Sequence, residues 1–223
     1  MKIEPIAHFH SPFSTKFGVP KQSGLVDGLH GTIEFVPKYR NADALRGLDG
    51  FDYIWLVWEF SANRHLASSP VVRPPLLGGN TKVGVFATRS PFRPNRMGLS
   101  SVRMDFIEID TQRGPLIHVL GADLMDGTPI YDIKPYVVYA DSHPDARCGF
   151  VDTNAVRRLR VVMPEDVVAK LNFSASELEE LRKVLELDPR PQYHNNADKV
   201  YGMLYGGRDV HFKVSGEVLK LTY

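Results

Sequence analysis

The chain has 223 residues, 43% of them hydrophobic, a formal net charge of +1 and a single cysteine, Cys148. This length allows a sizeable core and two domains, and the near-neutral charge argues against a general polyanion binder. One cysteine excludes an internal disulfide and a cysteine-based zinc site. No apolar run approaches the ~20 residues of a membrane span, and the N-terminus lacks a secretion-signal pattern. We therefore expect a cytoplasmic protein with no membrane association.

Short apolar segments separated by turn residues dominate the first part of the chain. Residues 53–60 form an aromatic strand pattern, and residues 83–87 read as a buried strand. Further strands are expected at 2–9, 31–37, 99–110 and 116–120. Many short strands with almost no helix indicate an antiparallel β-barrel or sandwich, which we assign to residues 1–145.

The pattern changes after a polar, turn-rich stretch at 143–154, which we interpret as a linker. Ser174 and Glu177 form a capping-box signature ahead of a helical apolar stripe. Strands are expected at 159–163, 199–205, 210–214 and 218–223. The chain should therefore be mainly β, with an N-terminal antiparallel β-barrel and a small C-terminal α+β domain over residues 155–223.

The segment 84–101 is an irregular stretch under strong backbone constraint. Pro91 and Pro94 fix φ and remove two backbone donors, which excludes a helix or a central strand. Between positions 60 and 104 there is no Asp or Glu, but there are seven cations: Arg64, Arg73, Lys82, Arg89, Arg93, Arg96 and Arg103. A rigid loop rich in arginine favours the binding of anions or planar groups. The alternative is a solvated loop whose arginines pair with acids elsewhere.

A second polar constellation lies at residues 123–136. Asp126 precedes Gly127, which ordinary Asx-turn chemistry explains. Asp132 and Lys134 lie in a strand-like segment, where Asp is disfavoured, and they would share one face. They could contact a ligand or pair with each other, and the sequence leaves both alternatives open.

The tail contains a stiff Arg and Tyr display. Arg190 stands between two prolines, and Tyr193 follows three residues later. This arrangement suits phosphate contact and base stacking, although a rigid linker with an incidental arginine is an equal alternative. No P-loop or GxGxxG fingerprint is present. His8 and His10 lack a third ligand in view, so no metal site is expected.

Several motifs resemble those of the TsaA family, also called TrmO. They are VPKQ at 19–22, RPPLLGG at 73–79, GVFATRSPFRPN at 84–95, DGTPIYDIKPY at 126–136 and, in the tail, DPRPQY at 188–193. The resemblance implies S-adenosylmethionine-dependent methylation of N6 of threonylcarbamoyladenosine, just 3′ of the anticodon of threonine tRNA. It also implies a donor site in a β-barrel, unlike the doubly wound sheet of most methyltransferases, and a homodimer.

The resemblance also implies which residues bind the methyl donor. These are Pro20, Lys21 and Gln22, then Ser61 and Ala62, Arg89, Leu99, and finally Asp123, Leu124, Met125 and Asp126. Ser61 and Ala62 lie in a stretch without a distinctive motif. Lys21 stands where an arginine is familiar, which keeps the charge but loses the planar fork.

The residues themselves suggest how the reaction would be divided between them. Methyl transfer from a sulfonium needs in-line positioning more than acid–base machinery. An acceptor nitrogen conjugated to a carbonyl is a poor nucleophile, so a base is desirable. We nominate Asp132 as that base, with Lys134 orienting it or the threonyl carboxylate. The candidate tRNA contacts are Arg93, Arg96, Arg190 and Tyr193.

Three further expectations follow. Trp55 and Trp58 should point to opposite faces of their strand, so that one of them is available to a second subunit. A chain cut near Asp152 should keep donor binding and lose tRNA methylation, because the tail has none of the barrel motifs. The rival functions are a non-enzymatic RNA-binding barrel and a methyltransferase acting on a small molecule.

Overall fold

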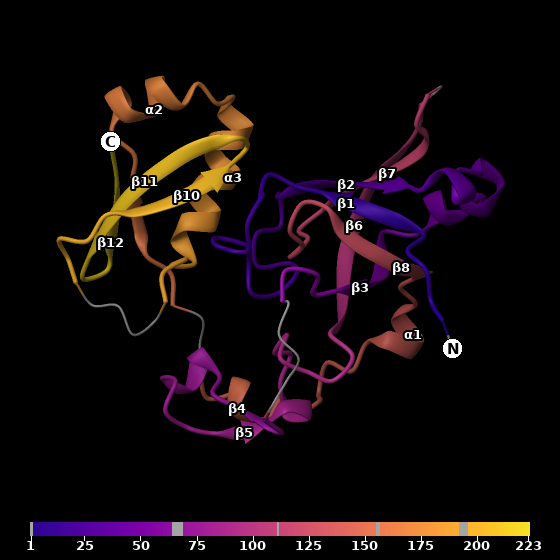
Figure 1. Ribbon diagram of the computed structural model, residues 1–223, viewed down its shortest axis with the longest axis horizontal. Helices are drawn as coiled ribbons and strands as arrows, with labels where there is room; N and C mark the ends of the chain where they lie inside the picture. The colour runs from indigo at the N-terminus through magenta and orange to yellow at the C-terminus, as the bar shows by residue number, and fades with distance from the viewer. Residues whose placement is uncertain (1, 64–68, 111, 155–156, 192–195) are drawn as a thin grey trace.

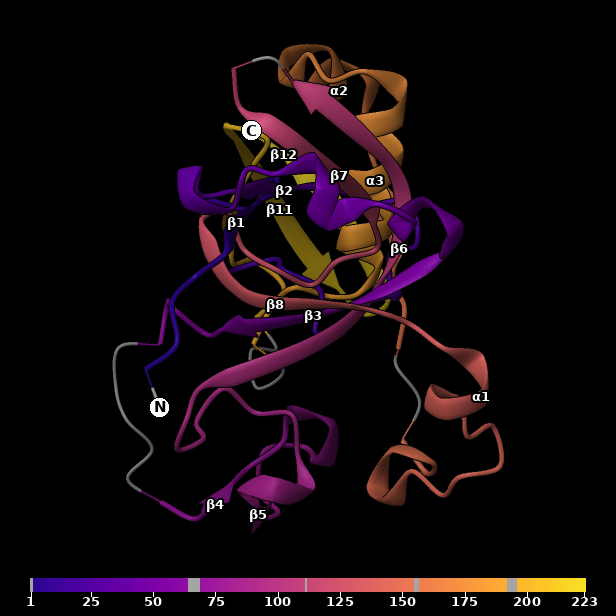
Figure 2. The ribbon, with the colours of Figure 1, turned by 90° about the vertical axis from the view of Figure 1, so that its right-hand side faces the viewer.

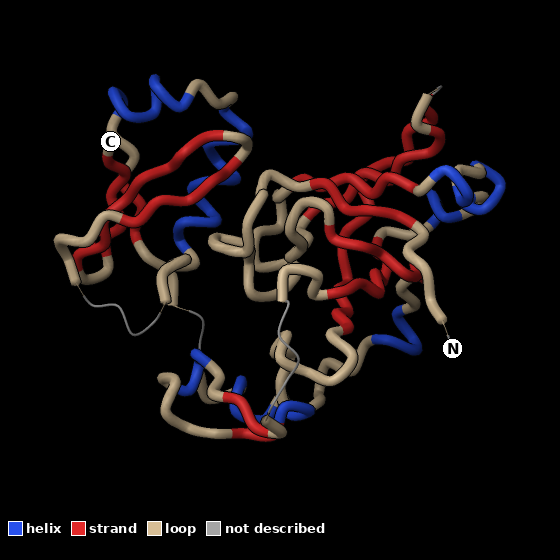
Figure 3. The backbone as a smooth tube through the Cα atoms, viewed as in Figure 1, coloured by secondary structure: helices blue, strands red, loops and turns tan. Residues whose placement is uncertain are grey.

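The computed structural model describes residues 2–63, 69–110, 112–154, 157–191 and 196–223. It contains a closed six-stranded barrel and, beside it, a four-stranded sheet covered by helices (Figure 1). Figure 3 shows that most strands lie in these two bodies and that a small two-stranded sheet lies among the loops, apart from both. Within the described ranges, no helix is long and apolar enough to cross a lipid bilayer.

The barrel closes in the order β1-β2-β7-β6-β3-β8, with every neighbouring pair antiparallel. Its strands are β1 (Ala7–His10), β2 (His30–Phe35), β3 (Tyr53–Glu59), β6 (Met97–Asp110), β7 (Gly114–Leu120) and β8 (Thr128–Pro135). Short 3₁₀ turns, η1 (Pro37–Tyr39), η2 (Ala42–Leu45) and η3 (Leu48–Gly50), connect β2 to β3. The predicted antiparallel barrel is confirmed.

Strand β3 shows why this sequence forms a barrel wall. Its residues alternate, with Ile54, Leu56 and Trp58 buried inside and their neighbours facing outward. Trp55 is one of the outward residues, so the two tryptophans do point to opposite faces. Opposite Trp58 stands Gly98 of β6, where an added Cβ would lie 2.3 Å from the indole ring. Glycine is therefore required there by close packing.

The segment before the arginine loop differs from the predicted strand at 83–87. Strand β5 is only Val83–Gly84 and pairs with β4 (Val71–Val72) in a hairpin that lies outside the barrel in both views (Figures 1 and 2). A 3₁₀ turn, η5 (Val85–Ala87), follows, and the Thr88 hydroxyl donates to the Val85 carbonyl at 2.8 Å. Phe86 is 80% exposed, so the segment lacks the two-sided burial that stabilises a central strand.

The C-terminal body has the strand order β10-β11-β12-β9, with β9 parallel to β12. Its elements are β9 (Arg160–Val162), α2 (Glu165–Leu171), α3 (Ala175–Glu186), β10 (Tyr201–Tyr205), β11 (Arg208–Ser215) and β12 (Val218–Thr222). Ser174 and Glu177 form the predicted capping box. The sequence patterns did not predict α2, nor the short pieces α1 (Val138–Asp141), η4 (Pro75–Leu77) and η6 (Gly149–Val151).

Candidate functional site

Three segments meet at one rim of the barrel: the β1–β2 connection (residues 11–29), the arginine loop (88–96) and the β7–β8 turn (121–127). Arg89 donates from Nη1 to the Gln22 side-chain oxygen. The Gly24 amide donates to the Gly121 carbonyl at 2.8 Å. The acid-free arginine loop therefore reaches the first predicted donor motif, and that motif lies against the turn that carries the second.

Asp123 is held at this rim by a relay from the barrel interior. The Trp58 indole N–H donates to the Ser100 hydroxyl at 2.9 Å, and that hydroxyl donates to the Asp123 carboxylate at 2.5 Å. Burial raises the pKa of Asp123, although the Ser100 hydrogen bond and the nearby Arg89 charge oppose the shift. The carboxylate is therefore fixed in orientation and partly withdrawn from water.

Sequence reasoning missed Trp58 and Ser100 as supports of the site. Ser100 is 2% exposed and occupies an inward position of β6 between Gly98 and Val102. A hydroxyl among inward apolar positions is the signal that could have identified it, because buried polar groups require a partner.

The rest of the β7–β8 turn divides between ligand-accessible and buried residues. Asp126 is exposed, and its Oδ1 lies 3.2 Å from His10 Nδ1 and 3.3 Å from the Ser11 amide. Met125 is half-buried. Leu124 is 1% exposed and belongs to the barrel core, so only its backbone can face a ligand.

The remaining predicted donor residues lie around this rim in different environments. Pro20 is buried, and Lys21 beside it is exposed. Ser61 and Ala62 are exposed in the turn that follows β3. Leu99 points outward from β6 and is 56% exposed, which leaves an apolar surface next to the Ser100 relay.

Asp132 and Lys134 lie on the outer wall of the barrel, and their side chains form an ion pair at 2.8 Å. Of the two alternatives that the sequence left open, pairing with each other is the one observed. Asp132 stands opposite Val57 of β3, and Val57 stands opposite Leu99. Asp132 thus shares an outward row with Leu99, whereas Lys134 lies in the next outward row, opposite Trp55. Neither residue contacts Arg89 or Asp123 among the described residues.

The other two arginines of the loop act as internal braces. Arg93 donates to the carbonyls of Thr88 and Ser90 at 3.1 and 3.2 Å. Arg96, which has a φ of 44°, pairs with Glu59 at 2.9 Å. The alternative of arginines that pair elsewhere therefore describes Arg96, whereas Arg89 contacts Gln22 of the VPKQ motif.

Glu59 also accepts a hydrogen bond from the Tyr131 hydroxyl at 2.6 Å. Desolvation, together with the Glu59 hydrogen bond, raises the pKa of Tyr131 to about 12. Tyr131 therefore stays a neutral donor at physiological pH and helps to fix the Arg96–Glu59 pair at the base of the loop.

In the tail, Arg190 makes two hydrogen bonds of 2.8 Å to the Asp188 carboxylate, and its side chain is 12% exposed. This pairing raises the pKa of Arg190. The planar guanidinium is therefore already engaged by an acid two residues away. Tyr193 lies outside the described residues.

The rim combines a guanidinium, two carboxylates and an exposed leucine. This donor set fits S-adenosylmethionine, which carries a carboxylate, an ammonium group, ribose hydroxyls and an apolar chain. In the part of the chain that the structure describes, no group of three His, Cys, Asp or Glu residues could hold a metal ion.

Comparisons with known proteins cover almost the whole chain. Residues 8–142 match the family model of the tRNA-methyltransferase O N-terminal domain, and residues 157–222 match the TrmO C-terminal domain. The tRNA (adenine(37)-N6)-methyltransferase of Escherichia coli strain K12 is 37% identical over 96% of this chain and 93% of its own length. A relative from Pseudomonas aeruginosa strain PAO1, provisionally described as an S-adenosylmethionine-dependent methyltransferase, is 36% identical over 94% of this chain and 91% of its own.

Solved structures agree with the sequence relatives. The crystal structure of TrmO from Pseudomonas aeruginosa superposes with a TM-score of 0.78 at 30% identity, covering 99% of this chain and 96% of the other. Both family models and this full-length structural match point to one family. The chain belongs to the tRNA-methyltransferase O family.

Proposed function

We propose that this chain is an S-adenosylmethionine-dependent tRNA methyltransferase that modifies N6 of adenosine 37, and that its substrate is the threonylcarbamoyl form of that adenosine in threonine tRNA. The observation that carries the proposal is the meeting of Gln22, Arg89 and Asp123 at one rim of the barrel, in a chain of this family. The named activity of the Escherichia coli relative supports the same position and atom.

The rim residues would bind and orient the donor. When bound, S-adenosylmethionine supplies an electrophilic methyl group on a sulfonium. Arg89 would hold the donor carboxylate in a charge-assisted hydrogen bond. Asp123 and Asp126 would accept from ribose hydroxyls or the ammonium group, and Leu99 would cover the apolar chain. Because these groups position an activated donor, binding geometry supplies most of the catalysis.

Asp132 and Lys134 on the outer wall of the barrel would act on the acceptor adenosine. Asp132 would take the proton that leaves N6 as the new N–C bond forms and the bond between the methyl group and the donor sulfur breaks, which would leave a neutral thioether. Lys134 would then exchange its ion pair with Asp132 for one with the threonyl carboxylate. Asp132 shares the outward row with Leu99, which favours an acceptor that approaches from outside the barrel.

A second subunit would complete this outer wall. The outward side of the barrel carries Tyr53 and Leu99, both substantially exposed, and Trp55, whose ring lies 5.7 Å from that of Tyr136. Clustered aromatic residues of this kind are typical of subunit interfaces. We propose a homodimer through this face, and sedimentation that shows only monomer at micromolar concentration would exclude it.

For tRNA contact we propose Arg190 and Tyr193 in the tail and Arg93 and Arg96 in the loop. The observed pairing of Arg190 with Asp188 means that tRNA phosphate must compete with, or add to, that contact. Arg190→Ala should then raise the apparent KM for tRNA and reduce the salt slope by about 0.9 for a duplex contact or about 0.7 for a single strand. Donor affinity should not change, because phosphate contacts do not reach the cofactor.

Calorimetric titration with S-adenosylmethionine, followed by methyl incorporation, tests the proposal. The chain should bind the donor and methylate threonine tRNA that carries the threonylcarbamoyl group, but not the same tRNA without it. Equal methylation rates on the two tRNAs would contradict the proposed contact between Lys134 and the threonyl carboxylate. Binding of tRNA without any donor affinity would favour the non-enzymatic RNA-binding barrel instead. We also propose a cytoplasmic location and no metal requirement.

A further inference from the structure

The hydrophobic core of the C-terminal body contains residues that are distant in the sequence. Phe13, Val26 and Leu29 of the β1–β2 connection are at most 2% exposed and belong to the same cluster as the buried residues of α3, β10, β11 and β12. Phe17 and Val19 pack against that cluster from the same connection. The segment 11–29 is therefore folded onto the C-terminal body, although it joins two barrel strands.

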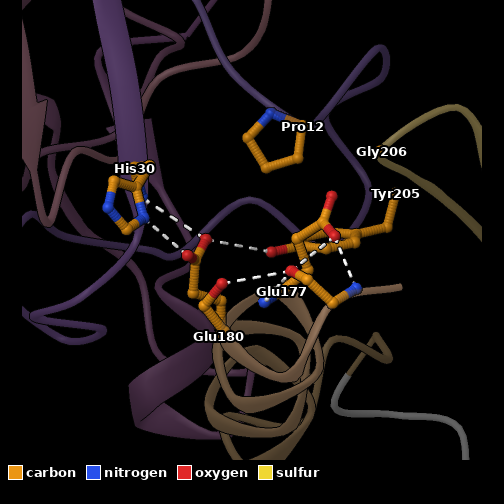
Figure 4. A pocket seen from close by; sticks show the side chains of 8 residues that line it. Pro12, His30, Glu177, Glu180, Tyr205 and Gly206 are labelled. Carbon is orange, nitrogen blue, oxygen red and sulfur yellow. Dashed lines mark hydrogen bonds and ion pairs between the residues drawn. The ribbon is translucent and has the colours of Figure 1, made fainter.

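Polar contacts hold the segment to the C-terminal body as well. The Gly206 amide donates to the Pro12 carbonyl at 2.9 Å, and the Phe13 and Tyr205 rings meet edge to face at 5.4 Å. Figure 4 shows Glu180 of α3 between His30 and Tyr205. His30 Nδ1 lies 2.5 Å from its carboxylate, and the Tyr205 hydroxyl donates to the same carboxylate at 3.4 Å.

On its other side, the segment is joined to the donor turn. The Asp126 amide donates to the Phe13 carbonyl at 2.8 Å. The Gly121 amide donates to the Leu29 carbonyl at 2.8 Å, and the Gly24 amide donates to the Gly121 carbonyl at 2.8 Å. The segment thus lies between the C-terminal body and the turn 121–127, and Lys21 and Gln22 are carried on it.

The segment approaches β10 closely at Gly18, two residues before Pro20. Gly18 has a φ of +93°, and a Cβ built there would lie 2.1 Å from the Met203 sulfur. The segment can approach β10 this closely only without a side chain. The positions of Val19 and Pro20 therefore depend on the surface of the C-terminal sheet.

We infer that the C-terminal body positions the donor-binding segment, with Phe13 as the positioning residue at the junction. The inference rests on the proposed function, in which Pro20, Lys21 and Gln22 bind S-adenosylmethionine. Without the C-terminal core, Phe13, Val26 and Leu29 would face water. The conformational entropy lost in ordering the segment would then weaken the free energy of donor binding. This is the opposite of the sequence-based expectation that the tail is dispensable for the donor.

The test uses the full chain. Phe13→Ala should weaken S-adenosylmethionine binding about tenfold in calorimetry, within the range of ordinary coupling between sites. Phe13→Leu, which keeps most of the apolar volume, should lose less. Val214→Ala is the matched control, because it opens a cavity in the same core on β11, a strand whose backbone pairs with β10 and β12. Circular dichroism checks that each variant is folded.

Donor affinity unchanged in folded Phe13→Ala, or weakened equally in Val214→Ala, would overturn the inference. Hydrogen exchange on the unaltered chain gives an independent test should Phe13→Ala not fold. Because coupling is reciprocal, S-adenosylmethionine should increase the protection of β10 and α3 as well as of residues 121–126. Protection confined to residues 121–126 would reject the inference and leave the proposed function intact. A chain that binds no donor would reject the proposed function itself.

Discussion

The two hydrophobic cores of this molecule are built differently. Among the described residues, the barrel core consists of residues between Ile6 and Ile133, which come from the barrel strands, their connections and the position before β1. The C-terminal core takes Phe13, Val26 and Leu29 from the other end of the chain. One core is therefore contained within its own segment and the other is not. The order of residues along the chain identifies the strands, but it does not identify which core each loop joins.

A disturbance of the barrel core should destabilise the whole molecule more than one of the C-terminal core. Gly98 is the position that tests this. In Gly98→Ala the new Cβ would meet the rigid Trp58 indole at 2.3 Å. We expect a loss of about 3 kcal/mol in the free energy of unfolding, measured by chemical denaturation. Gly84→Ala is the control, since a Cβ there has nothing within 4 Å. Equal stability of both variants would contradict this account of the barrel wall.

Substitution of Arg89 tests the barrel rim, which lies between the two cores. Arg89→Ala should weaken S-adenosylmethionine binding by about 1.5–3 kcal/mol if the charged hydrogen bond to the donor is made. Calorimetry measures the effect. Arg113→Ala, which removes an exposed pair with Asp110 on the far hairpin, should leave donor affinity unchanged. Wild-type affinity in Arg89→Ala would place Arg89 outside the site.

Substitution of Asp123 should change the free energy of unfolding by an amount that depends on pH. Burial raises its pKa in the folded chain, so its protonated form favours folding. That stability is complete below the ordinary pKa of about 3.9 and is lost as pH rises through the folded pKa. Asp123→Asn should therefore be more stable than the unaltered chain at pH 7, and the gain should vanish near pH 3. Denaturation at both pH values checks this, and a gain that grows towards pH 3 would contradict it.

The smallest effect is expected at the helix cap of the C-terminal body. Ser174→Ala removes a side-chain acceptor for the Glu177 amide and should cost about 1 kcal/mol of stability. Hydrogen exchange in the first turn of α3 measures it. Ser215→Ala, which alters an exposed serine on β11 of the same body, is the control. A loss that also appears in the barrel strands would show that the two cores unfold as one unit.

Much of the fold could be predicted because alternation is a local property. The inward Ile54, Leu56 and Trp58 and the capping box at Ser174 are visible in a few consecutive residues. The 3₁₀ turn at 85–87 was missed because an apolar run alone does not reveal whether both faces are covered. Phe86 is largely exposed, and only the three-dimensional structure shows this.

Arg89, Asp123 and Asp126 were expected at the candidate site from the family resemblance. Arg89 lies near enough for its charge to act on Asp123, whereas Asp126 contacts His10 and Ser11. The Trp58–Ser100 support and the engagement of Arg93, Arg96 and Arg190 depend on contacts between distant residues, which spacing cannot supply. For Arg190, Asp188 stood only two residues away, and a bidentate pair at that spacing could have been considered.

Phe13 joins the two bodies, because its carbonyl accepts from the Asp126 amide and its ring packs on Tyr205. This junction has a consequence for protein engineering. A chimaera of two relatives joined at the linker would combine a β1–β2 connection from one parent with a C-terminal sheet from the other. Gly18 and Met203 would then come from different parents, although a Cβ at position 18 would lie only 2.1 Å from the Met203 sulfur. Residues 11–29 and 157–222 therefore form one discontinuous structural unit, and a chimaera should take both from the same parent.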